Sequence, residues 1–255
     1  MNLLFGSPSL ADEWKEIKDK HFVVYYGFAM TREDAGQVLR RAEGYYDKIA
    51  QQIGYARYSN FWTWEDRVKI IIYDNQNDFM QETHQPAWSM GYADRHPRLF
   101  KSKVIVTYKQ ENYFFDGLLP HEISHLILHD FFGQQTAIPL WFDEGVAQLQ
   151  ETEKRAVADR LMRRLVQQGK QLPLSTLIAM DIRKERNPTK AKVFYAQSLS
   201  VVDFLVVKYG SEAFGTLCRQ LRDGKPFAEA LRFAYSNSLE SVEQLENKWL
   251  NDLRN

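Results

Sequence analysis

Residues Leu118–Phe132 read LLPHEISHLILHDFF, and this stretch carries the strongest signal in the chain. His121 and His125 stand four positions apart among apolar residues, which predicts a helix with both imidazoles on one face. Glu122 is turned by roughly 100° around the same axis. Two ring nitrogens can therefore meet one metal ion while the carboxylate beside them takes a proton from water, as in zinc hydrolases with the H-E-x-x-H arrangement.

A third ligand is expected on the next helix. Eighteen residues follow His125 before Glu144, which lies in the segment Trp141-Phe142-Asp143-Glu144-Gly145. A catalytic zinc takes three protein ligands and keeps one position open, so Glu144 completes the set. The small residues Gly145 and Ala147 are expected to let this helix approach the histidine helix closely. Asp143 is the competing ligand, although it points roughly 100° away from Glu144.

Two further residues near this motif need an interpretation. Glu151 lies two turns after Glu144, where its carboxylate could accept the second N–H of a ligand histidine and fix its tautomer. The alternative for Glu151 is an ordinary solvated helix residue. His129 follows His125 by one turn but has no glutamate at the offset of a general base. We interpret it as a packing or surface residue.

Two segments carry a resemblance to a known family. Residues Leu118–His125, followed by Ile138–Ala147 (IPLWFDEGVA), resemble the peptidase MA-like gluzincins, which are zinc metallopeptidases distantly related to thermolysin and the alanyl aminopeptidases. The aminopeptidases share the eighteen-residue gap, the W-x-x-E-G-x-A core and an acidic residue seven positions after the glutamate ligand. The resemblance implies one Zn²⁺ held by His121, His125 and Glu144, with Glu122 as general base and Glu151 as an outer carboxylate.

A third block resembles the same group, and one block departs from it. Tyr195–Leu205 looks like the helix that carries a catalytic tyrosine in the aminopeptidases, which implies that Tyr195 donates a hydrogen bond to the oxyanion. The alternative is a tyrosine that covers hydrophobic surface, since the chain has 13 tyrosines. The aminopeptidases also carry a G-x-M-E-N segment that binds the amino terminus of the substrate. Nothing between Gly91 and Pro120 matches it, and Glu111-Asn112 stands only ten residues before His121, too near the catalytic helix to take that place. An endopeptidase is therefore expected.

Composition limits the class of protein. The chain has 255 residues, 44% of them hydrophobic, which suffices for one compact catalytic unit or two tightly joined lobes. The 33 basic and 33 acidic side chains give zero net charge, which argues against a nucleic-acid or anionic-membrane partner. Cys218 is the only cysteine, so an internal disulfide is excluded. The expected partner is a peptide or protein substrate; the oligomeric state stays open.

The N-terminus suggests export. Residues 1–11 end in Ser9-Leu10-Ala11, which is typical of a signal-peptidase cleavage site, although the apolar core before it is short. We interpret this segment as a truncated signal peptide, which predicts a periplasmic or secreted protein. The alternative is an ordinary ragged terminus and a cytoplasmic protein. Elsewhere no stretch approaches the ~20 apolar residues of a membrane span.

The order of predicted elements defines the fold class. We expect strands at 21–27, 67–74 and 101–109, helices at 31–54 and 75–81, a Gly- and Pro-marked connection at 88–97, and helices almost throughout from 116 onward. Pro120 fits the histidine helix if that helix begins in the preceding turn. The class is therefore α+β. A mixed-sheet lobe (12–115) and a mainly helical lobe (116–255) are expected to enclose the zinc site in a cleft. Residues 104–108 are expected at a sheet edge, where an extended peptide could pair.

Two other functions remain open. A catalytically inactive, peptidase-like binding module would have the same fold, but its hallmark is a missing ligand or base, and this chain has all four residues. A zinc hydrolase that acts on a non-peptide substrate has the same metal site, because the site does not define the substrate. A structural zinc site is disfavoured, since such sites use four protein ligands, usually with cysteines.

Overall fold

The computed structural model describes residues 14–54, 62, 66–94, 103–110, 113–133 and 136–255. The expected signal peptide at residues 1–11 lies outside this part. The chain divides into two compact units, of which the first comprises Met1–Tyr45 and Asn60–Leu126 and the second comprises Tyr46–Ser59 and Ile127–Asn255. The predicted division at residue 116 stays a prediction.

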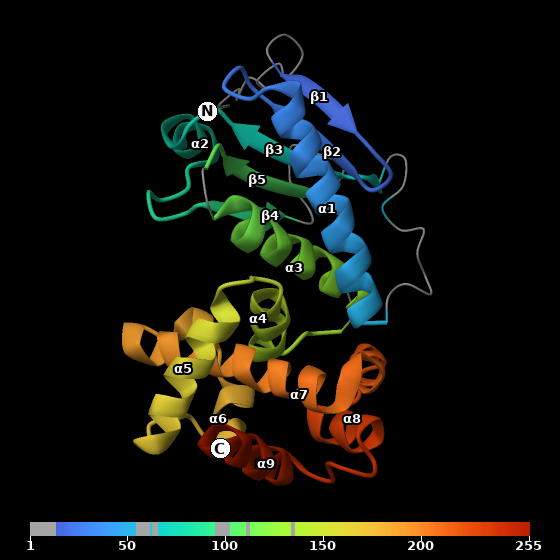
Figure 1. Cartoon of the computed structure of the whole chain (residues 1–255), viewed down its shortest axis with the longest axis vertical. Coiled ribbons are helices and arrows are strands. Elements are labelled where there is room, and N and C mark those ends of the chain that lie inside the picture. The colour runs from blue at the N-terminus through green and yellow to red at the C-terminus, as the bar shows by residue number, and fades with distance from the viewer. Residues whose placement is uncertain (1–13, 55–61, 63–65, 95–102, 111–112, 134–135) are drawn as a thin grey trace, which may run out of the picture. The chain divides into compact units, whose positions relative to one another are not determined.

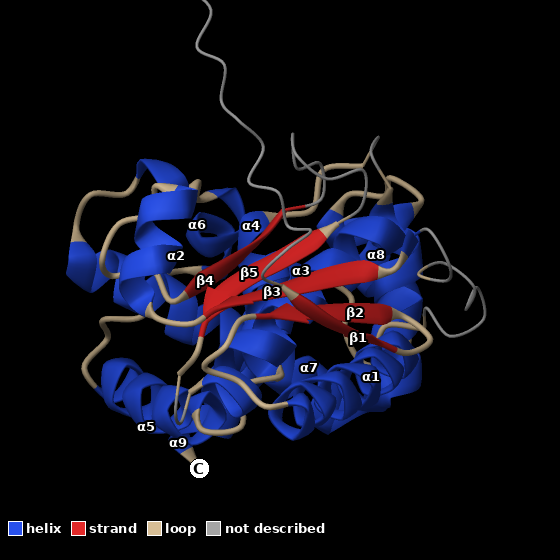
Figure 2. Cartoon of the chain, turned by 90° about the horizontal axis from the view of Figure 1, so that it is seen from above, coloured by secondary structure: helices blue, strands red, loops and turns tan. Residues whose placement is uncertain are grey.

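The first unit contains a five-stranded mixed sheet, drawn in red in Figure 2. The strand order is β1-β2-β3-β5-β4. The three inner strands run parallel, and the outer strands β1 and β4 each pair antiparallel with their neighbour. The strands are β1 (Lys15–Lys18), β2 (Phe22–Tyr26), β3 (Val68–Tyr73), β4 (Gly91–Asp94) and β5 (Val104–Tyr108).

The inner strands are apolar on both faces, as parallel strands covered on both sides must be. The register places Val24, Ile70 and Ile105 side by side, and each of them is fully buried. Ile71 and Val106 point to the opposite face, where they form a cluster with Phe79. Phe79 belongs to α2 (Gln76–Thr83), so this short helix covers that face of the sheet.

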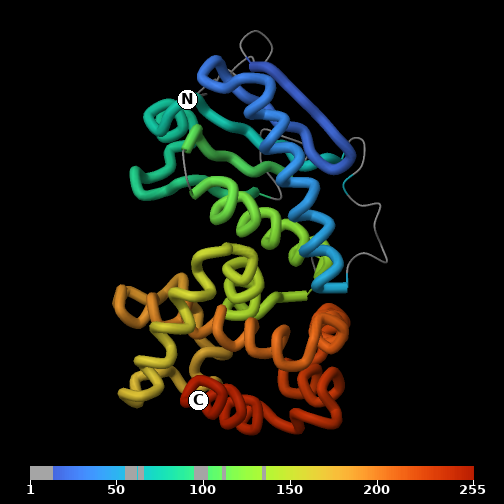
Figure 3. Tube along the Cα trace, in the orientation of Figure 1, coloured from blue at the N-terminus to red at the C-terminus, as the bar shows by residue number. Residues whose placement is uncertain are grey.

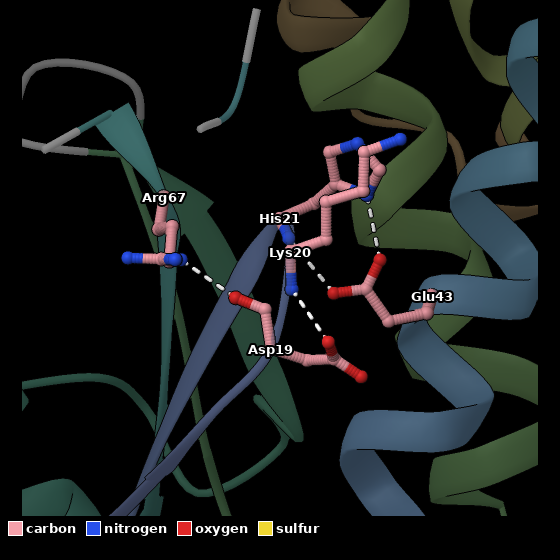
Figure 4. Close-up of polar contacts among 5 residues, drawn as sticks. All are labelled: Asp19, Lys20, His21, Glu43 and Arg67. Carbon is pink, nitrogen blue, oxygen red and sulfur yellow. Dashed lines mark hydrogen bonds and ion pairs between the residues drawn. The ribbon is translucent and has the colours of Figure 1, made fainter. Parts of the chain in front are cut away.

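Polar contacts fix the turn before β2, as Figure 4 shows. The guanidinium of Arg67 donates to the carbonyl oxygen of Asp19 at 2.6 Å. One carboxylate oxygen of Glu43 accepts from the backbone N–H of His21 at 2.8 Å, and the other lies 2.6 Å from its Nδ1. Glu43 is carried by α1 (Arg32–Gln52), so the pair ties this helix to the start of β2.

The second unit consists mainly of helices, which Figure 3 traces from yellow-green to red. The longest, α7, breaks at Gly210, where a φ of 84° requires glycine. A single turn η3 (Phe114–Leu118) leads into α3, which begins in the first unit and ends in the second. The helices from α3 onward are α3 (Leu119–Phe132), α4 (Leu140–Leu149), α5 (Lys154–Gln167), α6 (Leu174–Ala179), η4 (Ile182–Lys184), α7 (Pro188–Arg222), α8 (Phe227–Ala234) and α9 (Val242–Arg254).

The α+β class and the mixed sheet are confirmed, with strands early and helices late in the chain (Figure 1). The placement of residues 104–108 at a sheet edge is wrong, because β5 lies between β3 and β4. The predicted connection at 88–97 contains the strand β4, which forms that end of the sheet. Within the described part of the chain, no helix combines the length and apolar character needed to cross a bilayer.

Candidate metal and catalytic site

Helix α3 carries three of the predicted site residues, His121, Glu122 and His125, all of them half-buried. The wide turn of η3 runs directly into this helix, and the N–H of Leu119 donates to the carbonyl of Phe114. Pro120 therefore lies in the first turn of α3, where its missing N–H is tolerated. The prediction that the helix begins in the turn before His121 is confirmed.

The two imidazoles point toward each other. Nε2 of His121 and Nε2 of His125 lie 3.1 Å apart, with ring centroids at 4.7 Å and ring planes at 78°. Two nitrogens that share a tetrahedral zinc at 2.0–2.1 Å are separated by roughly 3.3 Å. The observed spacing fits two ligands of one ion.

Helix α4 carries Glu144, which is half-buried in the second unit. The residues around it are buried: Trp141 and Phe142 on one side in sequence, and Gly145 on the other. The ring of Phe142 stacks on Phe214 of α7 at 5.7 Å between centroids. These apolar anchors hold α4 against the helical core and leave Glu144 as a partly accessible carboxylate.

Gly145 has a close neighbour on another helix. A Cβ at this position would lie 2.6 Å from the carbonyl oxygen of Ser198 and 2.7 Å from Cγ2 of Val202, both on α7. Gly145 thus lies against α7, and the expectation that Gly145 and Ala147 let α4 approach the histidine helix stays a prediction. The absence of a side chain at Gly145 allows the backbones of α4 and α7 to approach.

That close approach brings Tyr195 of α7 near Glu144. The pKa of the Tyr195 phenol is raised, first by burial and second by the negative charge of Glu144. Gln148 links the same two helices, since its amide donates to the carbonyls of Glu144 at 3.3 Å and Tyr195 at 3.4 Å. Tyr195 as a whole residue is 37% exposed, so it is accessible in part to solvent.

Asp143 and His129 form a pair that was not predicted from the sequence. Asp143 is buried, and its carboxylate lies 2.9 Å from Nε2 of His129 on the last turns of α3. The sequence contained a signal for this pair. His129 lies one helical turn after His125, and Asp143 lies one residue before Glu144, so both members stand next to the predicted ligands. His129 is half-buried and has a carboxylate partner, which the interpretation from the sequence did not include.

Glu151 lies just beyond α4, whose C-cap is Gln150. Its side chain is only 1% exposed, and one carboxylate oxygen accepts from Nζ of Lys154 at 2.7 Å. The alternative interpretation of a solvated helix residue is therefore wrong. A carboxylate role toward a ligand histidine stays a prediction.

Comparison with protein-family models gives a match over most of the chain. The family model described as the peptidase MA superfamily matches residues 51–255, which include each candidate ligand and catalytic residue. A search of curated proteins found no match.

Proposed function

Because this chain belongs to the peptidase MA superfamily, we propose that it is a zinc-dependent metallopeptidase that hydrolyses internal peptide bonds. His121, His125 and Glu144 would hold one Zn²⁺, Glu122 would act as general base, and Tyr195 would support the oxyanion. The observation that carries the proposal is the 3.1 Å separation of the two imidazole Nε2 atoms, which suits two ligands of one ion.

The donor set supports zinc over harder cations. His121, His125 and Glu144 can each offer one ligand atom to a metal ion. Two imidazoles and one carboxylate are the ligands of catalytic zinc in His₂Glu enzymes, whereas calcium and magnesium take oxygen ligands. Three protein ligands leave one coordination position of the ion for water or substrate. A closed structural site has four protein ligands and leaves no such position.

Each residue has a defined task in the proposed hydrolysis. When bound, Zn²⁺ would supply a Lewis acid for the scissile carbonyl and lower the pKa of water toward ~7. The Glu122 carboxylate, one residue from His121, would take the proton of the attacking water and pass it to the leaving amine. The Tyr195 hydroxyl would donate a hydrogen bond to the developing oxyanion. The buried residues next to Glu144 would exclude bulk water from the first turn of α4.

The endopeptidase assignment rests on the sequence. The G-x-M-E-N segment that binds a free amino terminus in the aminopeptidases has no counterpart between Gly91 and Pro120, and Glu111-Asn112 lies outside the described residues. An enzyme without that anchor is expected to cut within chains.

The experiment is a digest of a proteome-derived peptide library by the purified protein, with and without a chelator. We expect internal cleavages that the chelator abolishes and added zinc restores. Glu122→Gln serves as the matched variant, since it keeps the side-chain volume and should retain zinc while losing nearly all turnover. Equal cleavage by Glu122→Gln and wild type would contradict the general-base assignment, and a library left uncut by the zinc-loaded protein would contradict the peptidase.

A further inference from the structure

The two residues beside Glu144 are both fixed, on different sides of α4. Asp143 is bound to His129 of α3, and Gly145 lies against the backbone of Ser198 in α7. Successive helix residues point about 100° apart, so Glu144 emerges between these two contacts. The rotation of α4 about its own axis therefore sets the direction of the Glu144 carboxylate.

The His129–Asp143 pair is the polar element among these contacts. The nitrogen–oxygen distance is 2.9 Å, and the two side chains are 27% and 10% exposed. The first turn of α4 follows Pro139, and among the described residues no side chain caps this N-terminus by a hydrogen bond. On the α3 side, the ring centroids of Phe132 and Phe142 lie 6.5 Å apart, which is an apolar contact without a directional hydrogen bond.

A small rotation of α4 would matter to a metal ligand. A turn of about 10° moves an atom that lies about 5 Å from the helix axis by roughly 0.9 Å. Ligand distances in metal sites hold to about 0.2 Å, so such a shift would displace the carboxylate from its coordination distance.

We propose that His129 is a positioning residue, which holds Asp143 and thereby the rotation of α4 that aims Glu144 at the metal. This inference rests on the proposed zinc site. It assigns a function to a histidine that is neither a ligand nor a base in the proposed mechanism. The property of His129 that the proposal requires is the hydrogen bond from its Nε2 to the carboxylate of Asp143.

The test measures the zinc dissociation constant by competition with a chromogenic chelator of known affinity. His129→Leu removes the donor, and we expect zinc affinity to fall about 10- to 100-fold, the usual effect of losing an outer partner at a metal site. His129→Gln places an amide N–H near the position of Nε2 and should restore the affinity to within about threefold of wild type.

Two more variants distinguish a loss of zinc affinity caused by misplacement of Glu144 from a loss caused by a less stable fold. Arg155→Leu breaks the Arg155–Asp203 pair between α5 and α7 in the same unit and should leave zinc affinity unchanged. His129→Leu with Asp143→Leu removes both members, so that no buried charge is left unpaired and the fold is expected to persist. Its zinc affinity should still fall as in His129→Leu, and thermal melts of every variant confirm that folded protein is compared.

The outcomes distinguish this inference from the proposed function. Wild-type protein that fails to bind zinc would contradict the proposed function itself. If wild type binds zinc and the folded double variant binds it equally well, His129 does not position Glu144 and the inference is wrong. Equal losses in His129→Gln and His129→Leu would also overturn it, because the restored hydrogen bond would then have no effect.

Discussion

Replacing Gly145 with alanine tests the helix packing that places Glu144 beside Tyr195. The added methyl carbon would lie 2.6 Å from the carbonyl oxygen of Ser198 and 2.7 Å from Cγ2 of Val202. Ordinary contacts between carbon atoms lie near 3.5–4.0 Å, so α4 and α7 must separate by roughly 1 Å. Overpacking of this kind costs about 1–3 kcal/mol, and backbone atoms cannot rotate away, which favours the upper end.

The net effect is smaller, because alanine is a better helix residue than glycine by about 0.5–1 kcal/mol. We expect Gly145→Ala to lower the free energy of unfolding by about 2 kcal/mol, which corresponds to a Tm lower by about 4–8 °C in a chain of this size. Urea unfolding followed by circular dichroism gives the first quantity, and calorimetry gives the second.

Gly44 provides the matched control, since it lies exposed in α1, and a methyl group added there would meet no other described side chain or neighbouring element within 4 Å. Gly44→Ala makes the same substitution in a helix without a clash and should stabilise the protein by about 0.5–1 kcal/mol. Opposite signs at the two glycines are the expected result. A Gly145→Ala protein as stable as Gly44→Ala would refute the close approach of α4 and α7.

Three further changes test other parts of the account. Tyr195→Phe should lower kcat about 100- to 1000-fold with little change in KM, because it removes the proposed oxyanion donor; an unchanged kcat in peptide assays would rule that donor out. Burial, then Glu82 and then Tyr92, raise the pKa of Tyr73 to about 12. Between pH 10 and 12 the unfolded state therefore loses this proton before the folded state, so stability falls as pH rises. Tyr73→Phe should flatten that fall in urea unfolding, and identical slopes would count against it. His21→Ala leaves the carboxylate of Glu43 without its imidazole and should cost about 2–4 kcal/mol; a loss under about 0.5 kcal/mol, typical of surface changes, would contradict that anchoring.

Local patterns in the sequence predicted most of the elements but not their pairing. The inner strands were recognisable because parallel strands covered on both faces are apolar runs, as in β3. The outer strand β1 reads KEIK and is largely exposed, and β4 reads GYAD and is half-buried throughout. Neither has an apolar run or a strict alternation. Strand order depends on contacts between distant segments, which is why β5 was wrongly placed at an edge.

In the candidate site, too, local patterns were predictable from the sequence and contacts between distant segments were not. The positions of His121 and His125 on one helix face follow from the four-residue period alone, and the structure places their Nε2 atoms 3.1 Å apart. The neighbour of Gly145 could not be predicted, because it is a backbone carbonyl of a helix more than fifty residues later. Glu151 was expected on the helix face, but α4 ends at Leu149, and element ends are the least predictable property of a sequence.

The zinc content of purified variants, measured by elemental analysis, tests the central claim most directly. We predict one zinc per chain in wild type and in Glu122→Gln, and almost none in His121→Ala, His125→Ala or Glu144→Ala after dialysis against a weak chelator. Glu144→Ala protein that kept a full equivalent of zinc, with wild-type affinity, would contradict the proposed three-ligand site.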